Sequence, residues 1–98
     1  MFALKYQLVF SDSAKIDVAD IMAYTIENWG EKQLANYKEI LDKTFILLQQ
    51  NPRIGKNTVK EFMVFPVGEH CIFYKIEENT LYITRILHKK TDISQHIN

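Results

Sequence analysis

The sequence predicts an α+β fold of order β-α-α-β-β-β, in which one twisted, mainly antiparallel sheet carries an αα-hairpin on one face. Three observations predict it. Apolar residues recur at helical spacing through two neighbouring stretches of the first half. A single glycine, Gly30, separates these stretches. Three runs rich in Val, Ile, Phe, Tyr and Thr, joined by short turns, fill most of the second half.

The first element that we expect is a strand over Leu4–Phe10, because apolar and polar residues alternate there. Such alternation is typical of a strand with one buried face. Ser11 follows it, and its side-chain oxygen is suited to accept a backbone N–H at the start of a helix.

A first helix is predicted from about Ala14 to Trp29, with Gly30 as its C-terminal stop. The stripe predicted to face the core consists of Ile16, Val18, Ala19, Met22, Ala23, Ile26 and Trp29. Ile21 and Tyr24 fall outside this stripe, one turn apart, so both are expected on the exposed side.

A second helix is predicted from about Glu31 to Gln50, and Asn51-Pro52 ends it because residues before proline disfavour the helical region. Its predicted core stripe consists of Leu34, Tyr37, Ile40, Leu41, Phe45, Leu47 and Leu48, and leaves Ile46 outside. Because only Gly30 separates the helices, they should form an antiparallel hairpin.

Strands are expected at Val59–Phe65, His70–Ile76 and Leu81–His88, with turns at residues 66–69 and 77–80. Connections this short make neighbouring strands antiparallel. The helical hairpin covers one face of such a sheet. The outward face is therefore expected to be uncovered by this chain and available to a partner.

The composition narrows the function classes. The 98 residues are expected to form a single domain, residues 1–98. Twelve basic residues balance twelve acidic ones, which argues against a partner held mainly through phosphates and against sequence-specific nucleic-acid binding. The single cysteine, Cys71, leaves no intramolecular disulfide and fits a reducing compartment. The sequence has neither a signal peptide at residues 1–10 nor an apolar run long enough for a membrane.

No catalytic residue, metal or cofactor is assigned. Cys71 and His70 are adjacent on a predicted strand, so their side chains point to opposite faces and cannot form a dyad with each other. His88, Asp92 and His96 have a spacing that would place them on one face of a helix. Since the residues before Lys89 are predicted to be a strand, surface or interface roles are favoured over a zinc site.

Several short motifs follow one another along the chain. They are Tyr24 and Trp29-Gly30 with Gln33, Tyr37 and Leu41; Asn51-Pro52-x-Ile54-Gly55; Phe65-Pro66-x-Gly68-x-His70-x-Ile72-Phe73-Tyr74; and Ile83-x-Arg85-Ile86-Leu87-His88, with Asp92 and His96 after it. In order and spacing they resemble the RelE/ParE superfamily of bacterial toxin–antitoxin systems, and its ParE branch most. The resemblance spans about residues 6–97.

The resemblance implies the same β-α-α-β-β-β fold and a small cytoplasmic toxin. It also implies neutralisation by a ParD-like antitoxin, which has a DNA-binding N-terminal part and a C-terminal segment that folds onto the toxin. The ParE branch is known for poisoning DNA gyrase, here by binding and without chemistry of the toxin's own.

Two alternatives stay open. The RelE branch cuts mRNA on the ribosome, and in that case Lys60, Arg85, His88 and His96 would surround a phosphate. RelE-like nucleases use several cations and often a C-terminal tyrosine near the scissile phosphate. This chain has no net charge and no tyrosine after Tyr82, which favours the ParE branch. The second alternative is an inactive relative that only binds its antitoxin, because Met63 and Val64 stand where ParE-like sequences often carry an arginine.

The candidate partner contacts are taken from the exposed apolar positions and from the motifs, together with the outward sheet face. They are Ile21, Tyr24, Ile46, Lys60, Met63, Arg85, His88 and His96. For Arg85 a structural role is favoured as much as a partner contact. In that role it would pair with Asp92 or with a carboxylate on the sheet face. The sequence leaves the oligomeric state open, homo-oligomers included.

Overall fold

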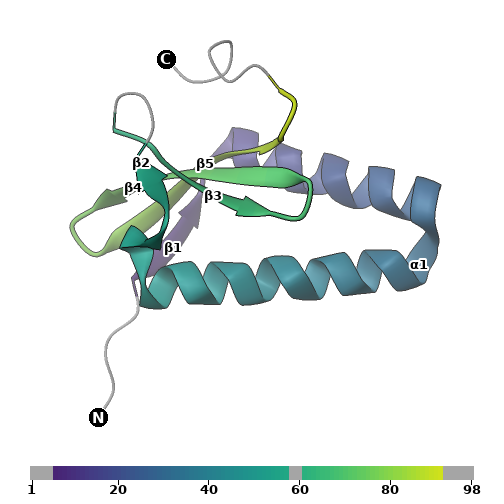
Figure 1. The fold of residues 1–98 in the computed structure, drawn as a ribbon, viewed down its shortest axis with the longest axis horizontal. Coiled ribbons are helices and arrows are strands. Elements are labelled where there is room, and N and C mark those ends of the chain that lie inside the picture. Colours follow the sequence, from purple (N-terminus) through teal and green to yellow (C-terminus); the bar gives the residue numbers. More distant parts are fainter. Residues whose placement is uncertain (1–5, 58–60, 92–98) are drawn as a thin grey trace.

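The computed structural model describes residues 6–57 and 61–91. Its elements are β1 (Gln7–Phe10), α1 (Asp12–Gln50), a 3-10 turn (Pro52–Ile54), β2 (Lys56–Asn57), β3 (Met63–Val67), β4 (His70–Glu77) and β5 (Thr80–His88). The strands form one sheet in the order β1-β5-β4-β3-β2 (Figure 1). β1 runs parallel to β5 and the remaining pairs are antiparallel, so the predicted α+β architecture is confirmed. The two-residue strand β2 was not predicted.

Both predicted helices lie within α1, which changes direction at Gly30. Gly30 has φ 88° and ψ 177°, a backbone conformation that favours glycine. It separates an N-terminal arm, residues 12–29, from a C-terminal arm, residues 31–50. Figure 1 shows the arms joined at one end, with the β3–β4 turn pointing into the space between them. The predicted helical hairpin is therefore confirmed.

The buried face of the N-terminal arm differs from the predicted stripe. Ala14, Ile21 and Thr25 are buried, whereas Ile16 is 61% exposed and Trp29 is 68% exposed. At 100° per residue, Ile16 and Ile21 lie on roughly opposite sides of the helix. Apolar residues occur on both sides, and docking against β5 selects the side that also carries Asp17. The stripe prediction was only partly correct, because Val18 and Met22 pack against the main core while periodicity alone does not show which apolar side meets the sheet.

The C-terminal arm follows its predicted stripe more closely. Leu41, Phe45 and Leu48 are buried, and Ile46 is exposed as predicted, whereas Ile40 of the predicted stripe is exposed as well. The ring of Phe45 meets that of Phe10 edge to face, with centroids 5.0 Å apart.

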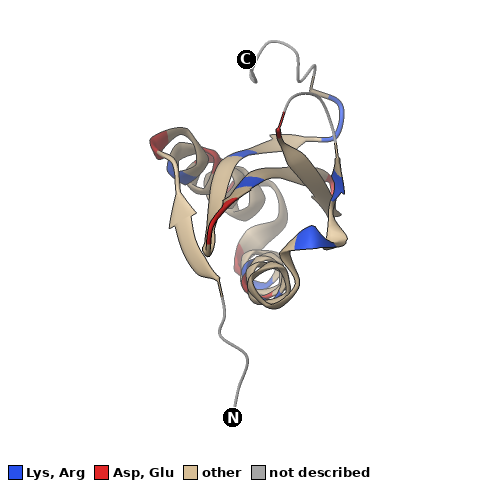
Figure 2. Cartoon of the chain, turned by 90° about the vertical axis from the view of Figure 1, so that its left-hand side faces the viewer, with Lys and Arg blue, Asp and Glu red and all other residues tan. Residues whose placement is uncertain are grey.

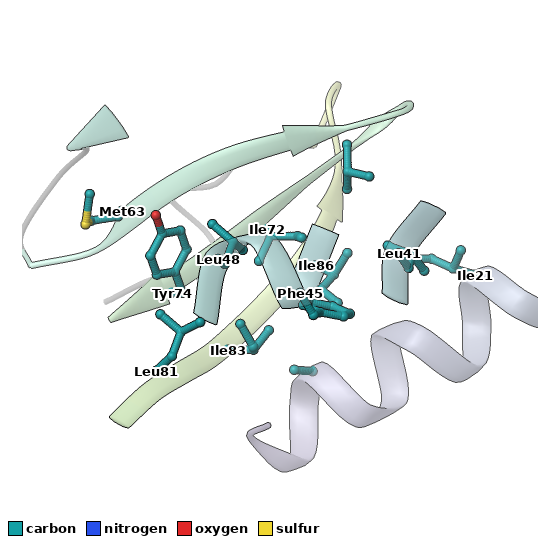
Figure 3. Close-up of a cluster of buried hydrophobic side chains, with 12 residues drawn as sticks. Ile21, Leu41, Phe45, Leu48, Met63, Ile72, Tyr74, Leu81, Ile83 and Ile86 are labelled. Carbon is teal, nitrogen blue, oxygen red and sulfur yellow. The ribbon is translucent and has the colours of Figure 1, made fainter. Parts of the chain in front are cut away.

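The main core lies between the sheet and the two arms (Figure 3). Tyr74 sits at its centre, fully buried, and its hydroxyl donates to Pro52 O at 2.7 Å while accepting from Gly55 N at 3.0 Å. Both bonds hold the loop after α1 against β4. No buried side-chain polar atom of the described residues lacks a hydrogen-bond partner.

A bulge in the β4–β5 pairing shapes the sheet. Phe73 pairs with Arg85 and Tyr74 with Ile83, so Thr84 is an extra residue on β5. This extra residue allows Ile83 and Ile86, three positions apart, both to face the main core.

The outward face of the sheet is not bare, contrary to the expectation. Phe73 and Leu87 are buried there in a second cluster with Phe62, Val64 and Cys71 around them. Cys71 lies in this cluster while its neighbour His70 contacts Tyr37 of α1, so the prediction of opposite faces is confirmed. The outward face is therefore a weaker candidate for a docking surface than the sequence indicated.

The two hairpin turns are shorter than predicted. Val67 pairs with His70 and Glu77 with Thr80, which leaves two-residue loops at residues 68–69 and 78–79. Gly68 has φ 57°, and a Cβ at this position would lie 2.8 Å from the Tyr37 ring. Gly68 thus provides both the turn geometry and the close approach of Tyr37.

Candidate partner-binding surfaces

Asp17 and Arg85 fix the N-terminal arm against the sheet. Arg85 donates from Nε to Asp17 Oδ2 at 2.8 Å and from Nη2 to Oδ1 at 2.9 Å. The backbone N–H of Ile86 also donates to Asp17 Oδ2, at 2.9 Å. Hydrogen bonding to Asp17 raises the pKa of Arg85. A bidentate pair of this kind is geometrically specific, so the arm has a defined position on β5.

Ser11 completes the same junction. Its N–H donates to Ile83 O at 2.9 Å, and its hydroxyl donates to Thr84 O at 2.8 Å. The hydroxyl oxygen accepts from Ala14 N at 2.9 Å, which confirms the predicted N-cap. The edge of β5 beyond the end of β1 is therefore occupied by polar groups of Ser11 and Asp17.

A first cavity, the hairpin pocket, lies between the two arms, the β3–β4 turn and the end of β5. It has a volume of about 480 Å³. Its lining residues are Asp20, Ile21, Tyr24, Thr25, Trp29, Gln33, Tyr37, Glu69, His70 and His88. Ile21 and Thr25 are buried, whereas the side chains of Tyr24 and Trp29 are largely exposed, at 62% and 68%.

A hydrogen-bonded pair, Tyr37 and His70, forms one side of the hairpin pocket. The Tyr37 hydroxyl lies 2.8 Å from His70 Nδ1 and donates to Val67 O at 3.1 Å. Because a phenol has one proton and a carbonyl only accepts, we infer that neutral His70 carries its proton on Nδ1. Burial, and then the charge of Glu69, raise the pKa of Tyr37 to about 12.

His88 packs edge to face on His70, with ring centroids 5.5 Å apart. His88 Nδ1 accepts from Lys90 N at 3.1 Å, so neutral His88 carries its proton on Nε2. Burial first, and the neighbouring His88 second, lower the pKa of His70, although Glu69 acts in the opposite direction. Near neutral pH, His70 therefore contributes a neutral imidazole to the pocket.

A second cavity, the edge groove, lies between both arms and β1, with a volume of about 800 Å³. Its lining residues are Leu8, Phe10, Lys15, Val18, Met22, Leu34, Lys38, Leu41, Asp42, Phe45, Ile46 and Gln49. Most of them are apolar. Among the described residues none lines both cavities, so the hairpin pocket and the edge groove are separate sites on α1.

Three of the predicted contact residues lie where a partner can reach them. Tyr24 and His88 are exposed in the hairpin pocket, and Ile46 is 45% exposed in the edge groove. The structure therefore divides these residues between two surfaces instead of gathering them in one.

The other predicted contacts have different positions. Ile21 was predicted to be exposed, but it is only 8% exposed and packs in the main core, because the N-terminal arm turns this side to the sheet. Met63 is equally buried, since its position on β3 faces the helices. Arg85 is held by Asp17 of α1, a helix carboxylate that the sequence did not single out, whereas Asp92 lies outside the described residues. Lys60 and His96 lie outside the described residues.

The described part of the chain contains no candidate metal site. Residues 6–57 and 61–91 contain no group of three or more His, Cys, Asp or Glu side chains placed to hold a metal ion. The spacing of His88 with Asp92 and His96 falls partly outside these ranges, because Asp92 and His96 are not described.

Several pocket residues were missed by sequence reasoning. Trp29, Glu69 and His70 were not among the candidate contacts, although Trp29 ends a helix beside Gly30 and could have been suspected there. Tyr37 and His70 are 33 positions apart, and no sequence pattern joins them. Only the packing of the C-terminal arm against the β3–β4 turn brings them together.

Charged residues are mixed over the molecule. Figure 2 shows basic and acidic segments interspersed along both arms and the sheet, without a broad face of one sign in that view.

The sequence matches a known protein family over most of its length. The family model described as "ParE toxin of type II toxin-antitoxin system, parDE" matches residues 8–93, which is most of the chain. This chain belongs to the ParE toxin family. It is accordingly a toxin of a type II toxin–antitoxin module, and the resemblance to the ParE branch is confirmed.

Individual relatives agree with this assignment. Toxin ParE1 of Caulobacter vibrioides is 29% identical over 90 residues, which cover 89% of this chain and 93% of that protein. A structure of the chromosomal ParDE system of P. aeruginosa has a TM-score of 0.74 at 15% identity, covering 86% of this chain and 96% of that one. The toxin–antitoxin complex RelBE2 of Mycobacterium tuberculosis has a TM-score of 0.65 at 21% identity, covering 88% and 100%. At these identities, the two structures show a shared fold.

No helix in the described part of this ParE-family chain is both long enough and apolar enough to cross a membrane.

Proposed function

We propose that this ParE-family chain is a cytoplasmic, single-domain toxin that inhibits DNA gyrase by binding it, and that a ParD-like antitoxin neutralises it. The match to the ParE family over residues 8–93 carries the proposal. The name of the ParDE relative pairs its toxin with an antitoxin, which supports a partner of the same kind here.

The edge groove is the surface that we assign to the antitoxin. Its apolar lining comes from both arms of α1 and from β1, and Ile46 is exposed beside it. An amphipathic segment with apolar residues on one face fits such a groove. The groove is lined by two basic residues, Lys15 and Lys38, and one acidic residue, Asp42. This charge balance favours an acidic segment as the occupant.

Binding without catalysis is the mechanism that the side chains favour. Arg85 is held by Asp17 in two hydrogen bonds, and His70 is bonded to Tyr37. These groups maintain the fold and are poorly placed to leave their partners for a scissile phosphate. Cys71 lies in an apolar cluster on the sheet face opposite His70, so His70 is not placed to act as a base for this thiol.

The test is a supercoiling and DNA-cleavage assay with purified gyrase and purified toxin. We expect loss of supercoiling and accumulation of cleaved DNA, both reversed by an equimolar ParD-like antitoxin. Ile46→Glu should weaken reversal by the antitoxin, because it places a charge in the apolar groove. The matched control, Ile16→Glu, changes an exposed isoleucine of α1 that does not line the groove and should be neutral.

Two other results would change the assignment. Cleaved transcripts in a translation extract, with gyrase unaffected, would show the RelE-like nuclease activity. If the toxin acts in neither assay but still binds its antitoxin, it is the inactive relative, and the burial of Met63 where related toxins often have an arginine would then be its structural correlate.

A further inference from the structure

The hairpin pocket differs from the edge groove in charge. Its described lining includes two carboxylates, Asp20 and Glu69, and no lysine or arginine. The edge groove has the opposite balance, with Lys15 and Lys38 against Asp42. The hairpin pocket is therefore negative at neutral pH, although the whole chain has no net charge.

His70 does not cancel this negative charge near neutral pH. His70 prefers the neutral form, because burial and the neighbouring His88 both lower its pKa. His88 accepts a hydrogen bond from Lys90 N through Nδ1. With the proton of His70 on Nδ1, its Nε2 is a further acceptor beside the two carboxylates.

Aromatic side chains stand at the same cavity. Tyr24 and Trp29 line it and are largely exposed. Exposed apolar side chains that gather in one place often mark an interaction surface. Tyrosine and tryptophan are also the residues that most often dominate binding energy at interfaces. Their ring faces attract cations, and tryptophan does so most strongly.

We propose that the hairpin pocket binds an arginine or lysine side chain presented by a protein partner. The cation lies between the carboxylates of Asp20 and Glu69, and its aliphatic stem packs on Tyr24 or Trp29. The volume of about 480 Å³ is sufficient for such a side chain together with part of the segment that carries it. A nucleic-acid phosphate is disfavoured, because both charged lining groups would repel it.

This site goes beyond the proposed function, because it shares no lining residue with the edge groove. An antitoxin segment in the edge groove leaves the hairpin pocket available. The two sites can therefore be tested separately, and failure of the gyrase assay would not change the result of a direct binding measurement at the pocket.

The experiment titrates the full chain with N-acetyl-argininamide and, as an uncharged isostere, N-acetyl-citrullinamide. Trp29 is the only tryptophan, so its fluorescence reports on the pocket directly. We expect saturable fluorescence changes and amide shifts centred on Tyr24, Trp29 and Glu69. Binding of the arginine probe should be about 5-fold tighter than binding of the citrulline probe, as expected for partly solvated charge pairs.

Charge-neutralising variants localise the effect. Asp20→Asn and Glu69→Gln should each weaken arginine binding by about 3-fold and leave citrulline binding unchanged. The matched control is Asp42→Asn, which removes an exposed acid from α1 at the edge groove and should change neither affinity. Circular dichroism of each variant checks that the fold is intact.

Three outcomes would overturn the proposal. The first is equal binding of the two probes, or no saturable binding of the arginine probe. The second is an equal loss of affinity in Asp42→Asn, since the attraction would then come from the overall charge. The third is a shift of the pocket resonances on raising the toxin concentration alone, together with a doubled mass in light scattering, because the occupant would then be a second copy of this chain.

Discussion

Asp17 on α1 and Arg85 on β5 are joined by two hydrogen bonds of 2.8 and 2.9 Å, across 68 positions of sequence. The same carboxylate accepts the N–H of Ile86 at 2.9 Å. One side chain thus both pairs with a guanidinium and satisfies a backbone donor at the edge of β5. This contact lies on the side of the N-terminal arm that carries the buried Ile21.

Replacing Asp17 should therefore destabilise the fold. We expect Asp17→Asn to lower the free energy of unfolding by about 2 kcal/mol, because it removes charge-assisted hydrogen bonds from a mostly buried site. Urea denaturation followed by circular dichroism measures the change. Asp20→Asn, an exposed acid one turn further along, is the control and should cost less than about 0.5 kcal/mol. An equal loss in both variants would contradict a specific role of Asp17.

Burial of His70 makes stability depend on pH below neutrality. The pKa of His70 is lowered in the folded state, so the unfolded chain takes up a proton first as the pH falls. The contribution of His70 is thus present above about pH 6.5, the usual value for histidine, and is lost as the pH falls through the lower folded-state pKa. Denaturation at several pH values between 8 and 5 should show this decline.

His70→Gln should reduce the loss of stability on lowering the pH from 8 to 5, because glutamine does not titrate. The variant can still bond to Tyr37 through its side-chain amide, so its stability near neutral pH should fall by about 1 kcal/mol or less. An unchanged pH profile would mean that groups other than His70 produce the decline.

Tyr37 should titrate late in an alkaline scan. Burial raises its pKa to about 12, whereas an unperturbed tyrosine titrates near 10. Because the unfolded chain loses this proton first, the contribution of Tyr37 to stability is present below pH 10 and is lost between pH 10 and about 12. The absorbance of tyrosinate at alkaline pH, compared between the native chain and Tyr37→Phe, measures it. A Tyr37 signal complete by pH 10.5 would show that the hydroxyl is not buried as described.

The two glycines with positive φ should respond differently to alanine. Gly30→Ala should cost about 1–2 kcal/mol, since a Cβ there meets nothing within 4 Å and only the left-handed backbone is unfavourable. Gly68→Ala should cost more, because its Cβ would also lie 2.8 Å from the Tyr37 ring. Thermal denaturation of both variants gives the comparison. An equal cost would show that Tyr37 moves aside without penalty.

Local sequence patterns determined most of the secondary structure. The αα-hairpin follows from two amphipathic stretches that meet at one glycine, and Gly30 indeed takes a conformation that favours glycine. Ser11 was recognised as an N-cap because capping depends on residues three positions apart. The antiparallel order of β3, β4 and β5 follows from loops too short for any other connection.

Tertiary structure decided which faces these elements use. Ile16 and Ile21 both fit apolar periodicity, and docking of the arm against β5, where Asp17 bonds to Arg85, places Ile21 inside and Ile16 outside. The hairpin pocket was not predicted for the same reason: Tyr37 and His70 meet only when the C-terminal arm docks beside the β3–β4 turn. Hydrogen bonds and packing between distant residues carry no local pattern. The sequence therefore determined the elements and the family, and the long-range contacts determined the surfaces left for partners.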